Sequence, residues 1–160
     1  MDEKFLNIVL YNPQIPPNTG NIIRLCSNTS SKLHLIKPFG FDLNTKSLRR
    51  AGLDYEANYQ TYENFSEFIE SQDKKTKRFF VSKFGEKIYS DQRFNHGDSL
   101  IFGSETNGLP ESLIESYKYP RLFIPMRQKC RSINLSNAVA ICVYEALRQN
   151  HFFNLDRYKE

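Results

Sequence analysis

The segment IFGSETNGLP, residues 101–110, places two glycines and one carboxylate directly after an apolar run. Gly103 and Gly108 flank Glu105, an arrangement typical of a loop that folds closely around a ligand. A phosphate-binding loop of the Walker type would continue with Lys and then Ser or Thr, but here Leu109 and Pro110 follow. The segment therefore has the glycines of a ligand-binding loop without the lysine that a phosphate site requires.

Two other polar segments have a similar composition, and each follows a strand-like run. Residues 18–24 read NTGNIIR, and residues 124–136 read IPMRQKCRSINLS. Gly, Asn and Ser expose backbone donors and tolerate left-handed conformations, so a ligand can approach the chain closely. Because all three segments follow predicted strands, we expect them to meet at one edge of a sheet and to form a shared binding site.

The roles of single residues in these loops remain open. Glu105 fits either a direct part in catalysis or a cap that accepts N–H groups from a neighbouring helix. The Arg24 guanidinium suits either an ordinary ion pair or a bidentate contact with a phosphate. Asn134, with Ser132 and Ser136 two residues away on either side, has the pattern of a helix cap.

Metal, serine-hydrolase and dinucleotide sites are not predicted. No HxxxH or CxxC spacing joins the histidines or the cysteines, and neither GxSxG nor GxGxxG is present. We expect surface or hydrogen-bonded core histidines, no metal, and free thiols, which favour a reducing cytoplasm. The residues concerned are His34, His96, His151, Cys26, Cys130 and Cys142.

The composition fits one globular domain over residues 1–160. Hydrophobic residues make up 39% and charged residues 25% of the chain, which excludes a disordered protein. No apolar run approaches the ~20 residues that cross a bilayer, so no membrane partner is expected. The net charge of +4 is modest, but basic residues cluster at 49–50, 74–78 and 127–131, where they fit either solvated surface or contacts to a nucleic-acid backbone.

Hydrophobic periodicity predicts strands alternating with helices. Strands are expected at 5–10, 33–36, 78–82, 99–102 and 121–125. Helices are expected at about 19–28, 45–53, 64–72, 110–116 and 135–149, the first only after three prolines and with Asn18 as its N-cap. This order predicts an α/β domain with a mainly parallel sheet flanked by helices. The tail after Gln149 receives no assignment.

Together the three polar loops resemble the three motifs of the SpoU branch of the SPOUT RNA methyltransferases. These motifs are N-x-G-N-x-x-R, F-G-x-E-x-x-G-L, and I-P-M followed by R-S-x-N-L-S-N-A-V, at Asn18–Arg24, Phe102–Leu109 and Ile124–Val139. The runs LNIVLYNPQIPPNTGNIIRLCSNT and SLRRAGLDY are similar to the single-domain subgroup that methylates the wobble nucleotide of tRNA. The match covers about Leu6 to Gln149.

The resemblance implies a fold and a cofactor that periodicity does not show. The C-terminal part, about residues 78–149, would form a trefoil knot that binds S-adenosylmethionine in a bent conformation and leaves S-adenosylhomocysteine as product. Since this cofactor carries no phosphate, the glycine loop needs no lysine. The implied cofactor-binding residues are Ser82, Gly103, Gly108, Ile124, Met126, Ser132 and Leu135.

The implied reaction is methyl transfer to the ribose 2′-hydroxyl of nucleotide 34, a cytidine or modified uridine of the anticodon loop. Arg24 would be the central catalytic residue, used for positioning because a guanidinium almost never deprotonates. Asn18 and Asn134 would orient the ribose or Arg24, and Glu105 would brace its loop.

The implied partners are tRNA and a second copy of the chain, with no DNA and no membrane. The family is homodimeric and builds its catalytic pocket at the subunit interface. Two alternatives stay open: a 2′-O-methyltransferase for another tRNA or ribosomal RNA position, and a non-catalytic RNA-binding protein of the same fold. The residues expected to contact tRNA phosphates are Arg49, Arg50 and Arg131.

Overall fold

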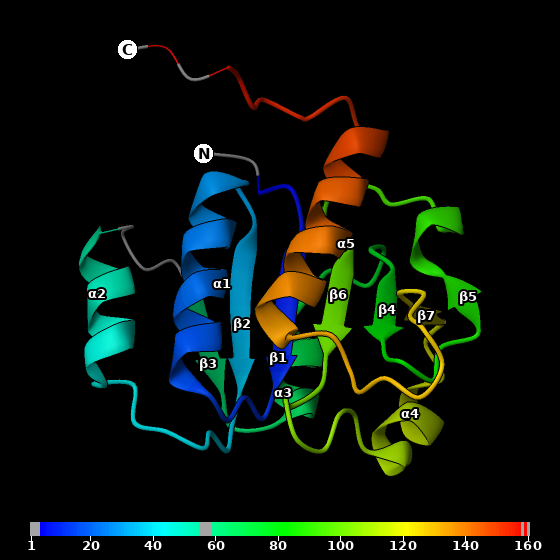
Figure 1. Cartoon of the computed structure of the whole chain (residues 1–160), viewed down its shortest axis with the longest axis horizontal. Coiled ribbons are helices and arrows are strands. Elements are labelled where there is room, and N and C mark those ends of the chain that lie inside the picture. Colours follow the sequence, from blue (N-terminus) through cyan, green and yellow to red (C-terminus); the bar gives the residue numbers. More distant parts are fainter. Residues whose placement is uncertain (1–3, 55–58, 158, 160) are drawn as a thin grey trace.

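A seven-stranded parallel sheet lies at the centre of the molecule, in the order β3-β2-β1-β6-β4-β7-β5 (Figure 1). The computed structural model describes residues 4–54, 59–157 and 159. Its sheet confirms the predicted α/β class with parallel strands. The strands are β1 (Asn7–Tyr11), β2 (Lys32–Ile36), β3 (Tyr59–Tyr62), β4 (Arg78–Val81), β5 (Lys87–Ile88), β6 (Ser99–Phe102) and β7 (Arg121–Phe123).

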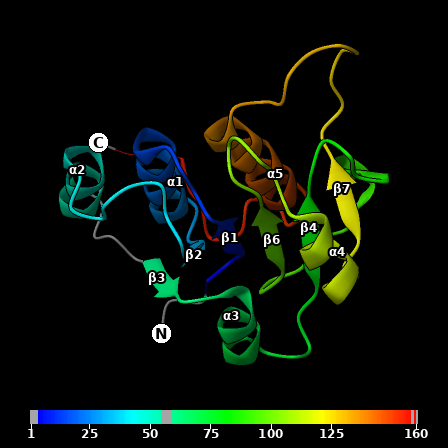
Figure 2. The same cartoon turned by 90° about the horizontal axis from the view of Figure 1, so that it is seen from below.

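Helices cover both faces of this sheet (Figure 2). The helices on one face are α1 (Pro16–Asn28), α2 (Lys46–Asp54) and α5 (Leu135–Gln149), and those on the other are α3 (Phe65–Ser71) and α4 (Glu111–Tyr117). A short 3-10 helix, η1 (Tyr89–Asp91), precedes β6. Tyr55, which ends the SLRRAGLDY run, lies outside the described residues.

Strand side chains alternate between two apolar layers. In β1, Ile8 and Leu10 join the larger cluster under α1 and α5, whereas Val9 joins the smaller cluster under α3 and α4. β6 repeats this pattern, because Leu100 and Phe102 point into the larger cluster. The near-continuous hydrophobicity of these runs is therefore explained by burial on both faces.

The first helix begins earlier than the sequence predicts. Pro16 and Pro17 do not exclude regular structure but occupy its first turn, where their missing N–H groups have no intrahelical acceptor to lose. Asn18 is consequently not the N-cap, a position held by Ile15. The side chain of Asn18 is buried and points away from solvent, so it is available for contacts with other loops.

Two strands and the tail were not predicted. β3 has a mixed polar sequence and β5 only two residues, and both lie at sheet edges where the hydrophobic signal is weak. The predicted cap of α3 is confirmed, because Asn64 accepts a hydrogen bond from the Glu67 N–H at 2.9 Å. The tail folds back so that the Phe153 ring lies 5.5 Å from Phe5, between ring centroids.

The strands run in one direction, so their carboxyl ends lie together at the lower edge in Figure 1. α1 and α5 also begin at this edge. The loops after β1, β4, β6 and β7 therefore meet there, as the sequence predicts for its three polar segments. The threading that would make a trefoil knot of residues 78–149 remains a prediction.

The remaining sequence expectations concern thiols and membranes. Cys26 and Cys142 are buried, which raises each thiol pKa to about 12, and Cys130 is exposed; none of the three forms a disulfide. In the described part of the chain, no helix has both the length and the apolar character to cross a bilayer.

His34 is a buried core residue in β2. Its Nε2 lies 2.8 Å from Asn7 Oδ1 and its Nδ1 lies 2.9 Å from the Tyr62 hydroxyl. The Asn7 amide nitrogen donates to the Gly97 carbonyl, which leaves Oδ1 as an acceptor and assigns the His34 proton to Nε2. Burial, with a smaller effect of Lys32, lowers the pKa of His34 from 6.5 to about 3.

We expect this neutral histidine to weaken the fold in acid. Below pH 6.5 the unfolded chain binds a proton at His34 that the native protein does not take up until about pH 3. Between pH 6.5 and pH 5 the free energy of unfolding should fall by about 2 kcal/mol. Urea unfolding of wild type and His34→Gln at pH 7.5 and 5.0 tests this, since only wild type should show that loss. Equal losses in both proteins would contradict it.

Candidate active site

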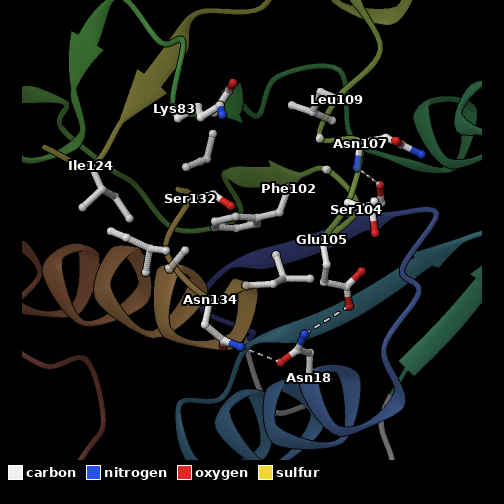
Figure 3. A pocket seen from close by; sticks show the side chains of 18 of the residues that line it. Asn18, Lys83, Phe102, Ser104, Glu105, Asn107, Leu109, Ile124, Ser132 and Asn134 are labelled. Carbon is white, nitrogen blue, oxygen red and sulfur yellow. Dashed lines mark hydrogen bonds between the residues drawn. The ribbon is translucent and has the colours of Figure 1, made fainter. Parts of the chain in front are cut away.

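A cavity of about 380 Å³ lies at the carboxyl edge of the sheet, within the size range of small-molecule sites. Its walls come from the loops after β4, β6 and β7 and from the start of α1 (Figure 3). The structure thus brings together residues that are up to 123 positions apart, from Ile15 to Ala138. The predicted site residues that line it are Asn18, Ser82, Gly103, Glu105, Gly108, Ile124, Met126, Ser132, Asn134 and Leu135.

A chain of hydrogen bonds joins the three polar loops beside this cavity. Asn18 Nδ2 donates to Glu105 Oε1 at 3.3 Å, and Asn134 Nδ2 donates to Asn18 Oδ1 at 3.0 Å (Figure 3). Asn134 Oδ1 in turn accepts from the N–H groups of Ser136 and Asn137 at the start of α5. We call Glu105, Asn18 and Asn134 the polar clasp.

Glu105 makes the contacts of the predicted cap. Its carboxylate accepts the backbone N–H groups of Gln14 at 2.8 Å and Ile15 at 3.0 Å, besides the Asn18 amide. These groups lie immediately before and at the N-cap of α1, where a negative charge is favourable. The carboxylate therefore fixes the start of α1 against the glycine loop, and its oxygens are engaged in that task.

Asn134 confirms the predicted cap of α5 and also sets the direction of the clasp. Its oxygen faces the α5 N–H groups, so its NH₂ group must face Asn18. Asn18 then presents its oxygen to Asn134 and its NH₂ group to Glu105. Each amide therefore has one orientation that satisfies both of its partners.

The glycine loop closes on itself. The Gly108 N–H donates to the Ser104 carbonyl at 2.9 Å, and the Asn107 N–H donates to Ser104 Oγ at 3.1 Å. A Cβ at Gly103 would lie 2.1 Å from the Gly108 carbonyl carbon, and Gly108 has a φ of +65°. The close contact at Gly103 is with the loop's own backbone. Both glycines line the cavity, and the approach of a ligand to them stays a prediction.

The cavity walls combine apolar and polar groups. Several lining residues were not predicted as site residues, although Phe102, Leu109 and Ala138 belong to the three motifs and most of the others lie in a loop after a predicted strand. Treating every residue of a strand-end loop as a candidate would have found most of them. They are Ile15, Val81, Lys83, Phe84, Phe102, Ser104, Thr106, Asn107, Leu109, Ile133 and Ala138.

The predicted arginines do not line the cavity. Arg24 is exposed on α1, six residues beyond Asn18, which places it about 9 Å further along the helix axis. At 100° per residue, the two side chains also leave the helix on different sides. Arg49 and Arg50 are exposed on α2, and Arg131 is exposed in the loop before α5. Within one copy of the chain, these cations lie outside the cavity lining.

The described residues contain no group of three or more His, Cys, Asp or Glu side chains placed to hold a metal ion. His34 is buried among hydrogen-bond partners, while His96 and His151 are exposed. The histidines thus have the core and surface positions that the sequence predicts.

Comparison with known families identifies the three-loop arrangement. The model of the SpoU rRNA Methylase family matches residues 5–144. The chain belongs to this family. Each of the three motif loops lies within the matched range.

Close relatives of this SpoU family member are known. It is 50% identical over 147 residues to a tRNA (cytidine(34)-2′-O)-methyltransferase of Aeromonas hydrophila, covering 90% of this chain and 94% of the relative. It is 47% identical over 147 residues to the Escherichia coli protein of the same name, covering 90% and 93%.

Solved structures of other proteins have the same fold. One, concerned with 2-OH methylation of C/U34 on tRNA, has a TM-score of 0.87 and 40% identity, covering 93% of this chain and 98% of that chain. The SpoU methyltransferase AviRb of Streptomyces viridochromogenes, in complex with AdoMet, has a TM-score of 0.81 at 24% identity, covering 94% and 60%.

The glycine loop of this SpoU family member gives a stability prediction. Gly103→Ala should lower the free energy of unfolding by more than about 2 kcal/mol, because backbone atoms must shift to admit the methyl group. Gly108→Asn is the matched control, since a side chain there meets open space and Asn tolerates left-handed φ. Its cost should stay below about 1 kcal/mol. Chemical unfolding measures both, and equal losses would contradict the assigned roles.

Proposed function

We propose that this chain transfers a methyl group from S-adenosylmethionine to the ribose 2′-hydroxyl of nucleotide 34 in the tRNA anticodon loop. The observation that carries the proposal is 50% identity across nearly the full length of a relative named for that reaction. The cavity formed by the three matching motifs supports it. The substrate nucleotide is cytidine or uridine, as in the structure concerned with C/U34.

The cavity suits this cofactor. Val81, Phe102 and Ala138 give it apolar walls for an adenine ring, and Ser82 and Ser132 add hydroxyl groups. Lys83 is the single basic residue among the described residues that line it, as suits a ligand without phosphate. When bound, S-adenosylmethionine supplies a methyl group on a positively charged sulfur. Gly103, Ile124 and Ser132 would hold it mainly by backbone groups, with Gly108, Met126 and Leu135 nearby.

The chain's own residues must align the ribose and help its hydroxyl lose a proton. Both amide groups of Asn18 and Asn134 are already paired in the clasp. We therefore assign Asn18, Asn134 and Glu105 to positioning the loops. Arg24 remains the residue proposed to act at the reacting oxygen, as a fixed positive charge that orients the hydroxyl or an adjoining RNA phosphate.

Because Arg24 lies outside its own chain's cavity lining, we place it in the site of a partner copy. α1 and α5 lie side by side on one face of the sheet (Figure 2). Exposed Ile141 and Tyr144 on α5 provide apolar surface for a homodimer contact on that face. A two-fold contact there would bring α1 of one copy toward its partner. The subunit interface would then complete both sites.

The remaining partners follow from charge and chemistry. Exposed Arg49, Arg50 and Arg131 are proposed contacts to phosphates of the anticodon stem-loop. The ribose 2′-hydroxyl is the group to be methylated, so DNA is not a substrate. We place the enzyme in the cytoplasm, treat residues 1–160 as one domain, and retain the trefoil knot as part of the proposed fold.

Ribonucleoside mass spectrometry of tRNA tests the function directly. Purified protein with S-adenosylmethionine should add one 2′-O-methyl group to cytidine or uridine 34 of unmodified or cell-derived tRNA. An anticodon stem-loop with a 2′-deoxy nucleotide at that position is the control and should accept none. Methylation at another tRNA position, or of ribosomal RNA only, would replace the position-34 assignment. Absence of both methylation and S-adenosylhomocysteine binding would favour a non-catalytic RNA-binding protein.

Mixed dimers test the placement of Arg24. Arg24→Ala and the cavity-filling Ser132→Trp should each abolish methyl transfer, and Arg24→Ala should still bind S-adenosylhomocysteine. Co-expressed together, they should recover about a quarter of wild-type activity, because half of the dimers would have one complete site. Recovery requires that Arg24 serves the partner's cavity. If verified mixed dimers recover no activity, Arg24 does not serve the partner's cavity and must act in the site of its own chain.

A further inference from the structure

Phe84 is the most exposed large hydrophobic side chain in the described part of the protein. Its relative exposure is 73%, although the two preceding strand residues, Phe80 and Val81, are buried. The residue nevertheless lines the cavity, together with its neighbours Ser82 and Lys83. An aromatic ring thus lies at the rim of the proposed active site with most of its surface open to solvent.

The turn that carries Phe84 is fixed by its backbone. The Ser82 N–H donates to the Leu122 carbonyl at 2.9 Å, and the Glu86 N–H donates to the Arg121 carbonyl at 2.9 Å. Between these anchors, the Phe84 N–H donates to Ser82 Oγ at 3.2 Å. A Cβ at Gly85 would lie 2.4 Å from the Leu122 carbonyl group, so this turn packs directly on β7. The backbone of this turn therefore holds the Phe84 ring in a fixed place at the cavity rim.

Positive charge accompanies the ring. Lys83 Nζ lies 5.0 Å from the centroid of the Phe84 ring, within the distance of a cation–π contact. Lys83 lies across the cavity from Asn18 and Asn134 (Figure 3). An exposed ring beside an ammonium group is the combination that single-stranded RNA recognition uses, because bases stack on the ring and phosphates approach the charge.

We infer that Phe84 is a stacking platform for the unpaired base of the nucleotide whose ribose is methylated, with Lys83 near the adjoining phosphate. This inference rests on the proposed function. The base is joined to C1′, next to the reacting C2′ position, so a ribose at the cavity mouth brings its base to the rim. Stacking also accepts cytosine and uracil alike, since every base has a π-face.

Two other roles for the Phe84 ring, in cofactor binding and in the dimer contact, fit its position less well. Phe102, which also lines the cavity, is buried as a ring of the cavity wall, whereas Phe84 is 73% exposed at the rim. The proposed dimer contact uses α1 and α5, and Phe84 lies instead on the loop after β4. An unpaired base arriving from solution fits both observations.

Substitutions at residue 84 test the inference. Phe84→Ala should weaken binding of the anticodon stem-loop, and raise its KM, by between about 5-fold and 150-fold. Phe84→Tyr retains the ring and should restore binding to within about threefold of wild type. S-adenosylhomocysteine affinity and dimer mass should not change in Phe84→Ala. Loss of cofactor affinity, or dissociation of the dimer, would overturn the inference.

An abasic ribonucleotide at position 34 identifies the stacked base. Wild type should bind this RNA as weakly as Phe84→Ala binds the normal stem-loop, and Phe84→Ala should lose nothing further. A full additional loss would mean that the ring contacts another base, which would overturn the assignment. Unchanged binding of normal RNA by Phe84→Ala would overturn it as well.

Fluorescence provides a second readout, because the chain contains no tryptophan. Phe84→Trp should respond to the stem-loop with quenched emission, whereas Phe152→Trp, a half-exposed control in the tail, should not. Equal responses would overturn the inference. Failure of wild type to methylate tRNA would overturn the proposed function and this inference with it; an active wild type with a neutral Phe84→Ala would overturn this inference alone.

Discussion

The Glu105 carboxylate lies against the start of α1, and the geometry of the site depends on this placement. It binds two backbone N–H groups and the Asn18 amide, and Asn18 passes the connection to Asn134 at the cap of α5. A neutral or shorter side chain at residue 105 would leave donors near a helix start without their charged acceptor. Because the bonds join residues 87 or more positions apart, one carboxylate and two amides set the relative positions of three motifs.

This constraint explains how a parallel sheet forms a cavity of defined shape at one edge. Parallel strands deliver their loops to one edge, but loops gathered at an edge still need fixed spacing. The polar clasp provides it between α1, the glycine loop and α5, while the glycine loop obtains its own shape from Gly103 and Gly108. The apolar layers on both faces hold the strands, and the hydrogen bonds define the opening between them.

The division of labour among residues follows from the same geometry. Side chains that most resemble catalytic groups, Glu105 and the two asparagines, are engaged in holding the loops. Arg24, the residue proposed to meet the reacting hydroxyl, lies on the outer side of α1, so the proposed site requires a second copy. Phe84 and Lys83 face outward from the opposite rim, where an RNA loop would arrive. In the proposed arrangement, a single chain forms the cofactor cavity and a partner copy completes the substrate site.

The sequence by itself determined the α/β class, the five main strands, the cap residues Asn64 and Asn134, and the three loops of the site, because hydrophobic period and cap chemistry act over a few residues. The prediction from the sequence was wrong at Pro16, which begins the helix that prolines were expected to delay. It missed β3 and β5, because their hydrophobic patterns are weak and neighbouring strands stabilise them. Only the tertiary structure decided that Glu105 caps α1, that Asn18 and Asn134 bond each other, that Gly103 contacts Gly108, and that Arg24 leaves the cavity lining. Each depends on atoms distant along the chain, or on the side of a helix that a side chain occupies, and local pattern carries neither.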